Sequence, residues 1–122
     1  MRKIIRELLL GFLLLAFLPA LTFAGTLTTK NHIVTVTQLC PEGYVSCDNV
    51  KYVGLSKKSG NSIELNGRTL HTSCADGITP CRFLGYEFKN DNITYRVLEI
   101  GILQVIQDGS EVLFEERGSW SY

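Results

Sequence analysis

The residues best suited to chemistry in this 122-residue chain are its four cysteines. They stand in two segments of one layout, CPEGYVSC from Cys40 to Cys47 and CADGITPC from Cys74 to Cys81. Redox-active and zinc-binding cysteines often occur as C-x-x-C pairs, and the chain contains none. An even number of cysteines at this wider spacing indicates disulfides.

Four cysteines allow three pairings, which spacing alone does not separate. We favour Cys40–Cys47 and Cys74–Cys81, because Gly43 and Gly77 lie inside the two segments and allow each to turn back within bridging distance. Each short bridge is expected to stabilise the fold by roughly 2–3 kcal/mol.

The similarity between the two halves extends beyond the cysteines. A shift of 34 residues superimposes Thr35 on Thr69, Cys40 on Cys74, Glu42 on Asp76, Gly43 on Gly77, Cys47 on Cys81 and Tyr52 on Tyr86. Internal duplication and two independent uses of one turn chemistry both explain this pattern, since two copies are too few for a repeat array. Either origin predicts that the loops are constrained alike and that Tyr52 and Tyr86 pack equivalently beneath them.

Other residues give little support for catalysis or metal binding. Ser73 follows His71 by two residues, which places both on one face of a strand without an acid to orient the histidine. Glu115 and Glu116 are adjacent, so strand geometry directs them to opposite faces. Two histidines without clustered carboxylates do not supply a zinc site. We therefore expect no enzyme activity and no cofactor. The enzymatic alternative would require His71 to titrate abnormally beside Ser73 in a cleft.

The candidate binding residues lie in the loops. A loop closed by a disulfide loses little conformational entropy on binding, which suits recognition. Tyr44 is a candidate anchor in the first loop, and Ile78 occupies a similar region of the second. Glu42 and Asp76 are the matching loop acids, and Lys57 and Lys58 form a separate cationic turn. In the alternative interpretation the loops only hold hairpins together, with Tyr44 folded back over the core.

The elements that position these loops are predicted to be strands. Alternating or β-branched runs cover Asn31–Leu39, Asn49–Ser56, Arg82–Lys89, Asn92–Glu99, Ile102–Gln107 and Ser110–Glu116. Polar turns are expected at Lys57–Gly60, Asn90–Asp91 and Asp108–Gly109, with a further hairpin closing at Leu98–Gly101. Asn66-Gly67 within SIELNGRTL predicts a two-residue hairpin turn at positive φ. The tail from Gly118 is expected to be a loose or docked end, with Trp120 as a packing plug.

These runs predict an all-β antiparallel meander of about eight strands, closed as a small barrel or packed as a sandwich and stapled by two disulfides. The 98 residues after position 24 are enough for a single domain, residues 25–122, with one modest core.

The N-terminus has the pattern of a secretory signal. Arg2, Lys3 and Arg6 precede an apolar stretch from Leu8 to Leu18, and small residues favour cleavage after Ala24. The 17 residues from Leu8 to Ala24 are short for a membrane span, which needs about 20. We therefore expect residues 1–24 to be removed, leaving a secreted or periplasmic protein without a stable membrane anchor.

The charge of the remaining chain argues against nucleic-acid binding. Of 12 basic and 12 acidic residues, the first 24 positions hold three and one, so 9 Lys and Arg face 11 Asp and Glu. A net charge of −2 with interspersed signs lacks the basic face of a nucleic-acid binder.

In size, export signal and disulfide-stapled all-β layout, the chain is similar to several groups of small bacterial envelope proteins that block lysozymes or toxins. It carries no diagnostic motif of any one group, so the similarity is architectural. We expect a non-enzymatic binding protein with an extracytoplasmic protein partner, an inhibitor or immunity-type protein against an envelope-targeted enzyme. The alternative is an accessory structural protein of the envelope, in which the loops only stabilise the fold.

Overall fold

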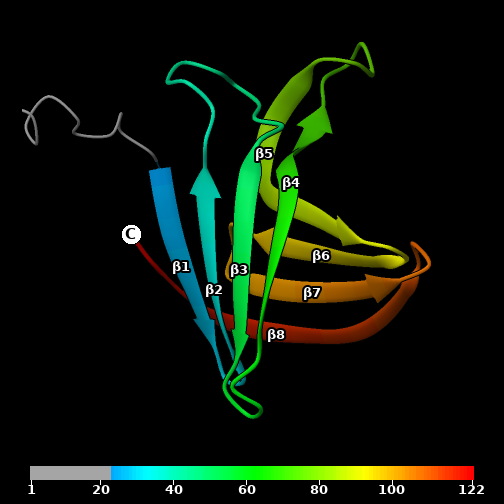
Figure 1. Cartoon of the computed structure of the whole chain (residues 1–122). Helices are drawn as coiled ribbons and strands as arrows, with labels where there is room; N and C mark the ends of the chain where they lie inside the picture. Colours follow the sequence, from blue (N-terminus) through cyan, green and yellow to red (C-terminus); the bar gives the residue numbers. More distant parts are fainter. Residues whose placement is uncertain (1–22) are drawn as a thin grey trace, which may run out of the picture.

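The computed structural model describes residues 23–122, and most of the predicted signal segment lies outside this part of the chain. The strands are β1 (Phe23–Thr29), β2 (His32–Gln38), β3 (Val50–Ser56), β4 (Ser62–Ser73), β5 (Pro80–Asn90), β6 (Ile93–Leu98), β7 (Ile102–Gln107) and β8 (Glu111–Ser121). Each pairs antiparallel with the next, and β1 pairs with β8 to close a barrel (Figure 1). The predicted all-β meander is confirmed, and it forms a barrel. Within residues 23–122, no helix is long and apolar enough to cross a membrane.

The C-terminal tail closes the barrel. Residues 118–121, predicted to be a loose or docked end, belong to β8 and pair with residues 26–29 of β1. Trp120 has the predicted packing role: its ring contacts Tyr86, and its indole Nε1 donates a hydrogen bond to the carbonyl oxygen of Leu98 at 3.1 Å. Cleavage after Ala24 would leave every one of these β1–β8 pairs in place, because they begin at Thr26.

The predicted hairpin turn at Asn66-Gly67 is wrong. Strand β4 continues through both residues, which pair with Lys51 and Val50 of β3, and neither residue has a positive φ. Glycine is needed here for space, since a Cβ atom at Gly67 would lie 2.1 Å from the carbonyl oxygen of Glu87 on β5. The Asn-Gly pair therefore marks a close approach of two strands. The expected hairpin would have divided β4 into two strands. The total of about eight strands still holds, because β1, which was not predicted, replaces the strand that is lost.

Strand β5 bends strongly, and β6, β7 and β8 run across the direction of β1–β4 (Figure 1). Gly85 on this strand has a φ of 146°, which is unfavourable for other residues, and beside it the pairing of β4 with β5 shifts register between Leu70 and His71. Before this bend, Pro80 and Phe83 pair only with β4, and from Gly85 onward β5 also pairs with β6. The β4–β5 hairpin therefore extends beyond the rest of the barrel and carries the second cysteine loop outward.

Two buried tyrosines pack against the same phenylalanine inside the barrel. Tyr52 contacts Phe88 with ring centroids 5.0 Å apart, and Tyr86 contacts the same Phe88 at 6.5 Å. Both tyrosines are buried in the core, as expected of repeat-related positions. Their hydroxyls, however, face opposite ends: that of Tyr86 accepts a hydrogen bond from Gln38, whereas that of Tyr52 lies close to Gly54. Buried aliphatic side chains complete the core, with Leu27, Val34, Val36, Val50, Val97 and Leu103 among them.

Candidate functional site

Both disulfides form with the favoured local pairing, Cys40–Cys47 and Cys74–Cys81. The first closes the β2–β3 connection, residues 39–49, and the second closes the β4–β5 connection, residues 74–79 and the start of β5. Because the strands alternate in direction, these connections lie at the same end of the barrel (Figure 1). We call this the loop end. Two disulfides are compatible with an extracytoplasmic protein.

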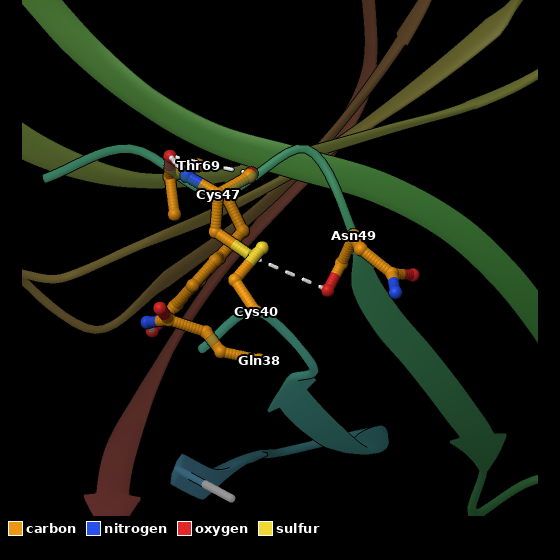
Figure 2. Close-up of a disulfide and its surroundings, with 6 residues drawn as sticks. Gln38, Cys40, Cys47, Asn49 and Thr69 are labelled. Carbon is orange, nitrogen blue, oxygen red and sulfur yellow. Dashed lines mark hydrogen bonds between the residues drawn. A yellow bond between two sulfur atoms is a disulfide. The ribbon is translucent and has the colours of Figure 1, made fainter. Parts of the chain in front are cut away.

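The first loop is fixed at its base to β4. The Cys47 backbone N–H donates to Thr69 Oγ1 at 2.9 Å, and the Thr69 N–H donates to the Cys47 carbonyl oxygen at 2.8 Å. Figure 2 shows the disulfide between these contacts and Asn49, whose carbonyl oxygen lies 3.3 Å from Cys47 Sγ. Cys47 is buried, whereas residues 41–46 are all exposed. The base of the loop is therefore part of the core, and its tip is presented to solvent.

The second loop is held by its own hydrogen bonds. Asp76 Oδ1 accepts hydrogen bonds from the backbone N–H groups of Ile78 and Thr79, each at 2.9 Å, and the Thr79 hydroxyl donates to Asp76 Oδ2. The Thr79 hydroxyl and these backbone groups lower the pKa of Asp76 to about 2. The loops are thus not constrained alike: Asp76 organises its own loop, while its counterpart Glu42 lies in the exposed tip of the first.

The most exposed large apolar side chains of the described residues lie in connections at the same end of the strands as the two disulfide loops, or at the end of β8, which Figure 1 shows away from both loops. Among the residues whose burial the structure describes, five large apolar residues are more than two-thirds exposed, from 68 % at Tyr44 to 86 % at Ile78, and the others are Val45, Ile100 and Tyr122. Each lies in a loop-end connection or at the end of β8. The exposed large apolar residues elsewhere in the described chain reach at most 51 %, at Val112. Tyr44 is therefore not folded back over the core.

The loop-end connections are also acidic. Residues 39–49, 74–79 and 99–101 contain Glu42, Asp48, Asp76 and Glu99 and no lysine or arginine. The cationic turn of Lys57 and Lys58 lies at the opposite end, between β3 and β4. Lys57 Nζ donates a hydrogen bond to the carbonyl oxygen of Thr29 at 2.7 Å. The structure therefore places the two predicted loops at the same end of the barrel as separate projections, and it places the predicted lysines at the other end.

His71 and Ser73, the two residues that the enzymatic alternative would require, lie in an irregular part of β4. Register shifts in β4 on both sides of His71 interrupt the alternation that was expected to place it beside Ser73. The His71 ring packs edge-on against Phe83 at 5.5 Å, and Ser73 pairs with Pro80.

Sequence reasoning missed a polar cluster at the opposite end of the barrel. Glu116 accepts hydrogen bonds from the Thr29 hydroxyl at 2.6 Å, the Asn31 side-chain amide at 2.9 Å and His32 Nδ1 at 3.0 Å. Burial of the carboxylate raises its pKa, but these donors and the nearby His32 outweigh burial and hold the pKa of Glu116 at about 2. The donors are 84 or more residues away in sequence, so no local pattern identifies the cluster.

A cavity of about 190 Å³ lies next to this cluster, in the barrel mouth opposite the loop end. Its walls include the aromatic side chains of Tyr52, Tyr95 and Phe114, and the His32 ring stacks on Phe114 with centroids 5.2 Å apart. Leu103 and Ile63 supply aliphatic surface. Gly54 also lines the cavity, and a Cβ there would lie 2.5 Å from the Tyr52 hydroxyl oxygen. Because Gly54 has no side chain, the ring and hydroxyl of Tyr52 fit beside it.

The outer face of β4–β6 carries a separate charged group. Glu87 is only 7 % exposed and lies between Arg68 on β4 and Arg96 on β6, its partners in register on the two neighbouring strands. The nitrogen–oxygen distances are 3.3 and 3.1 Å. These two guanidinium groups compensate the buried carboxylate, so this group is accounted for by the sheet itself.

No cluster of three or more potential metal ligands from His, Cys, Asp and Glu occurs in residues 23–122. Comparison of the chain with protein-family models, with curated proteins and with solved structures finds no match. The loop end and the barrel mouth are the two candidate sites of the described residues.

Proposed function

We propose that this is a non-enzymatic, extracytoplasmic binding protein whose loop end engages and inhibits an enzyme directed at the cell envelope. The observation that carries the proposal is the distribution of exposed apolar surface. Among the described residues, Tyr44, Val45 and Ile78 are large apolar side chains more than two-thirds exposed, and all three lie in loops closed by disulfides. Such residues are the usual anchors of protein interfaces, and they are costly to leave in water.

The construction of the loops favours recognition over mere stapling. Thr69 fixes the base of the first loop, and Asp76 fixes the backbone of the second. Because both loops are ordered before any partner arrives, little entropy would be lost on association. If the loops only stabilised the fold, polar residues at their tips would serve equally well, because exposing polar side chains to water is not unfavourable.

The charge of the loop end indicates the chemistry of the partner. Its connections carry four carboxylates, and the basic residue nearest to a disulfide is exposed Arg82, which follows Cys81 on β5. A partner with a basic surface around an apolar cleft would therefore be attracted electrostatically and would accept Tyr44 or Ile78 in the cleft. A cationic enzyme that acts on anionic envelope polymers has this character.

The test is affinity capture from the envelope fraction and medium of the producing organism, with the oxidised protein as bait. Tyr44→Ala and Ile78→Ala are the test variants. Val112→Ala is the matched control, because Val112 is the most exposed large apolar residue at the other end. We expect one basic enzyme to be retained by the wild type and the control, to be lost with Tyr44→Ala, and to elute as salt is raised.

The captured enzyme is then assayed with each purified variant. Inhibition by the wild type and by Val112→Ala, with at least a tenfold weaker effect of Tyr44→Ala, is the expected result. An unchanged thermal midpoint in Tyr44→Ala would show that folding is intact. If every bait returns the same background, the proposal is wrong and the accessory structural role, with loops that only stabilise the fold, takes its place.

A further inference from the structure

The cavity at the barrel mouth is independent of the loop end. Its lining residues come from β2, β3, β4, β6, β7 and β8 and from the β3–β4 connection, at the end of the barrel that carries Lys57 and Lys58. It is therefore enclosed by the barrel itself and does not depend on either disulfide loop.

One polar group borders this cavity without a hydrogen-bond partner among the described residues. Tyr52 is 2 % exposed, and its ring is held between Phe88 and Tyr95 with centroid distances of 5.0 and 5.5 Å. Its hydroxyl, beside Gly54, makes no hydrogen bond to any described residue. No side-chain nitrogen or oxygen that is sealed from solvent lacks a partner in the described residues, so this hydroxyl is accessible from the cavity and free to bond a molecule there.

The Tyr52 hydroxyl is a donor under all ordinary conditions. Burial raises its pKa far above the usual value of 10, and the neighbouring Tyr95 adds to this shift. The phenol therefore stays protonated, and the group that would satisfy it is a hydrogen-bond acceptor entering from the barrel mouth.

The remaining walls define the rest of the ligand. No lining residue is Asp, Glu, Lys or Arg, so a charged ligand would be desolvated without a counter-charge. The aromatic rings of Tyr95 and Phe114 offer stacking and edge contacts to a planar ring. A volume of about 190 Å³ suits a single ring with a small substituent, since a cavity of about 150 Å³ holds benzene.

We propose that the barrel mouth is a binding site for a small uncharged aromatic molecule that carries a hydrogen-bond acceptor, such as an aromatic ketone, with the Tyr52 hydroxyl as the donor. His32 contributes a fixed wall, because its Nδ1 is held by Glu116 and its ring is stacked on Phe114. This site goes beyond the proposed inhibitor function, and neither requires the other.

The test uses two ligands of similar size and shape. Acetophenone carries a carbonyl acceptor, and isopropylbenzene has the same number of non-hydrogen atoms without one. Each is titrated into the oxidised protein while the methyl resonances of Leu103 and Ile63 are followed by NMR, because these side chains line the cavity. We expect both ligands to shift these signals, with acetophenone binding about five- to tenfold more tightly because of one added hydrogen bond.

Two variants and a control locate the effect. Tyr52→Phe removes only the hydroxyl and is expected to abolish the preference for acetophenone while leaving isopropylbenzene binding unchanged. Ile63→Trp places a larger side chain at the partly exposed rim and is expected to block both ligands. Tyr44→Ala, at the loop end, should alter neither titration, and its partner capture is a separate readout.

The proposal is overturned if the methyl groups do not respond to either ligand. It is equally overturned if the two ligands bind alike, or if the preference persists in Tyr52→Phe, because the hydroxyl would then have no part in recognition. A folded Tyr52→Phe protein with an unchanged NMR spectrum outside the cavity makes these outcomes interpretable.

Discussion

Nδ1 of His32, the first residue of β2, lies 3.0 Å from Oε1 of Glu116 on β8. These two strands do not pair with each other, because β1 lies between them, and the Thr29 hydroxyl at the end of β1 donates to the same carboxylate oxygen. Glu116 therefore joins three consecutive strands at the point where the barrel closes.

This arrangement predicts a loss of stability in acid. The pKa of Glu116 is lowered from 4.5 to about 2, so its ionised form stabilises the fold above about pH 4.5. The contribution should disappear progressively as the pH falls from about 4.5 toward 2, because the carboxylate must be protonated. The midpoint of urea unfolding, measured across this range, checks the prediction.

Glu116→Gln is the variant that isolates this effect. It should lower the free energy of unfolding at neutral pH by about 1.5–3 kcal/mol, the range for hydrogen bonds to charged groups, and should flatten the acid dependence. Asp76→Asn is a necessary control, because the pKa of Asp76 is also lowered to about 2. An acid profile of Glu116→Gln parallel to that of the wild type would refute the assignment.

The close approach of β4 and β5 predicts opposite outcomes for the two residues of the Asn-Gly pair. Gly67→Ala would place a methyl group 2.1 Å from a backbone oxygen. It should lower the free energy of unfolding by about 2 kcal/mol or more, in the upper part of the range for overpacked cores. Asn66→Val should change stability by less than about 0.5 kcal/mol, because Asn66 is exposed in a continuous strand. A large loss for Asn66→Val would instead indicate a turn at this position. Thermal unfolding of the two single variants distinguishes these cases.

The glycine beneath Tyr52 gives a prediction about packing. Gly54→Ala would bring a Cβ atom within 2.6 Å of the Tyr52 ring and should destabilise the protein by about 1–3 kcal/mol. Tyr52→Phe, by contrast, should leave stability nearly unchanged, since the hydroxyl it removes has no partner in the described chain. Denaturant unfolding of both variants provides the comparison, and a marked loss in Tyr52→Phe would mean that the hydroxyl is satisfied within the fold.

The two disulfides should differ in what their removal costs. Replacing Cys40 and Cys47 by serine places a polar group at Cys47, which is 2 % exposed, in addition to releasing the loop. Replacing Cys74 and Cys81 releases a loop that Asp76 still holds by hydrogen bonds. We expect a loss of roughly 2–3 kcal/mol or more for the first pair and a smaller loss for the second. Equal losses would contradict the different anchoring of the two loops.

Local patterns in the sequence were sufficient for much of the fold. The alternating runs from Arg82 to Glu116 and the turns at Asp91 and Asp108 predicted strands and hairpins that the barrel contains, because alternation and turn preferences act between near neighbours. The two C-x6-C segments likewise predicted their own disulfides, since the residues that bring each pair together lie inside the loop.

Contacts between distant residues were decided only by the tertiary structure. Asn66-Gly67 has the sequence of a turn, yet the carbonyl of Glu87 from the next strand determines why glycine stands there. The tail from Gly118 has little strand character, and β1 provides its partner. The Glu116 cluster and the cavity beside Tyr52 arise for the same reason. Closing the barrel brings together side chains from strands far apart in the chain, and no pattern along a single strand records which of them will meet.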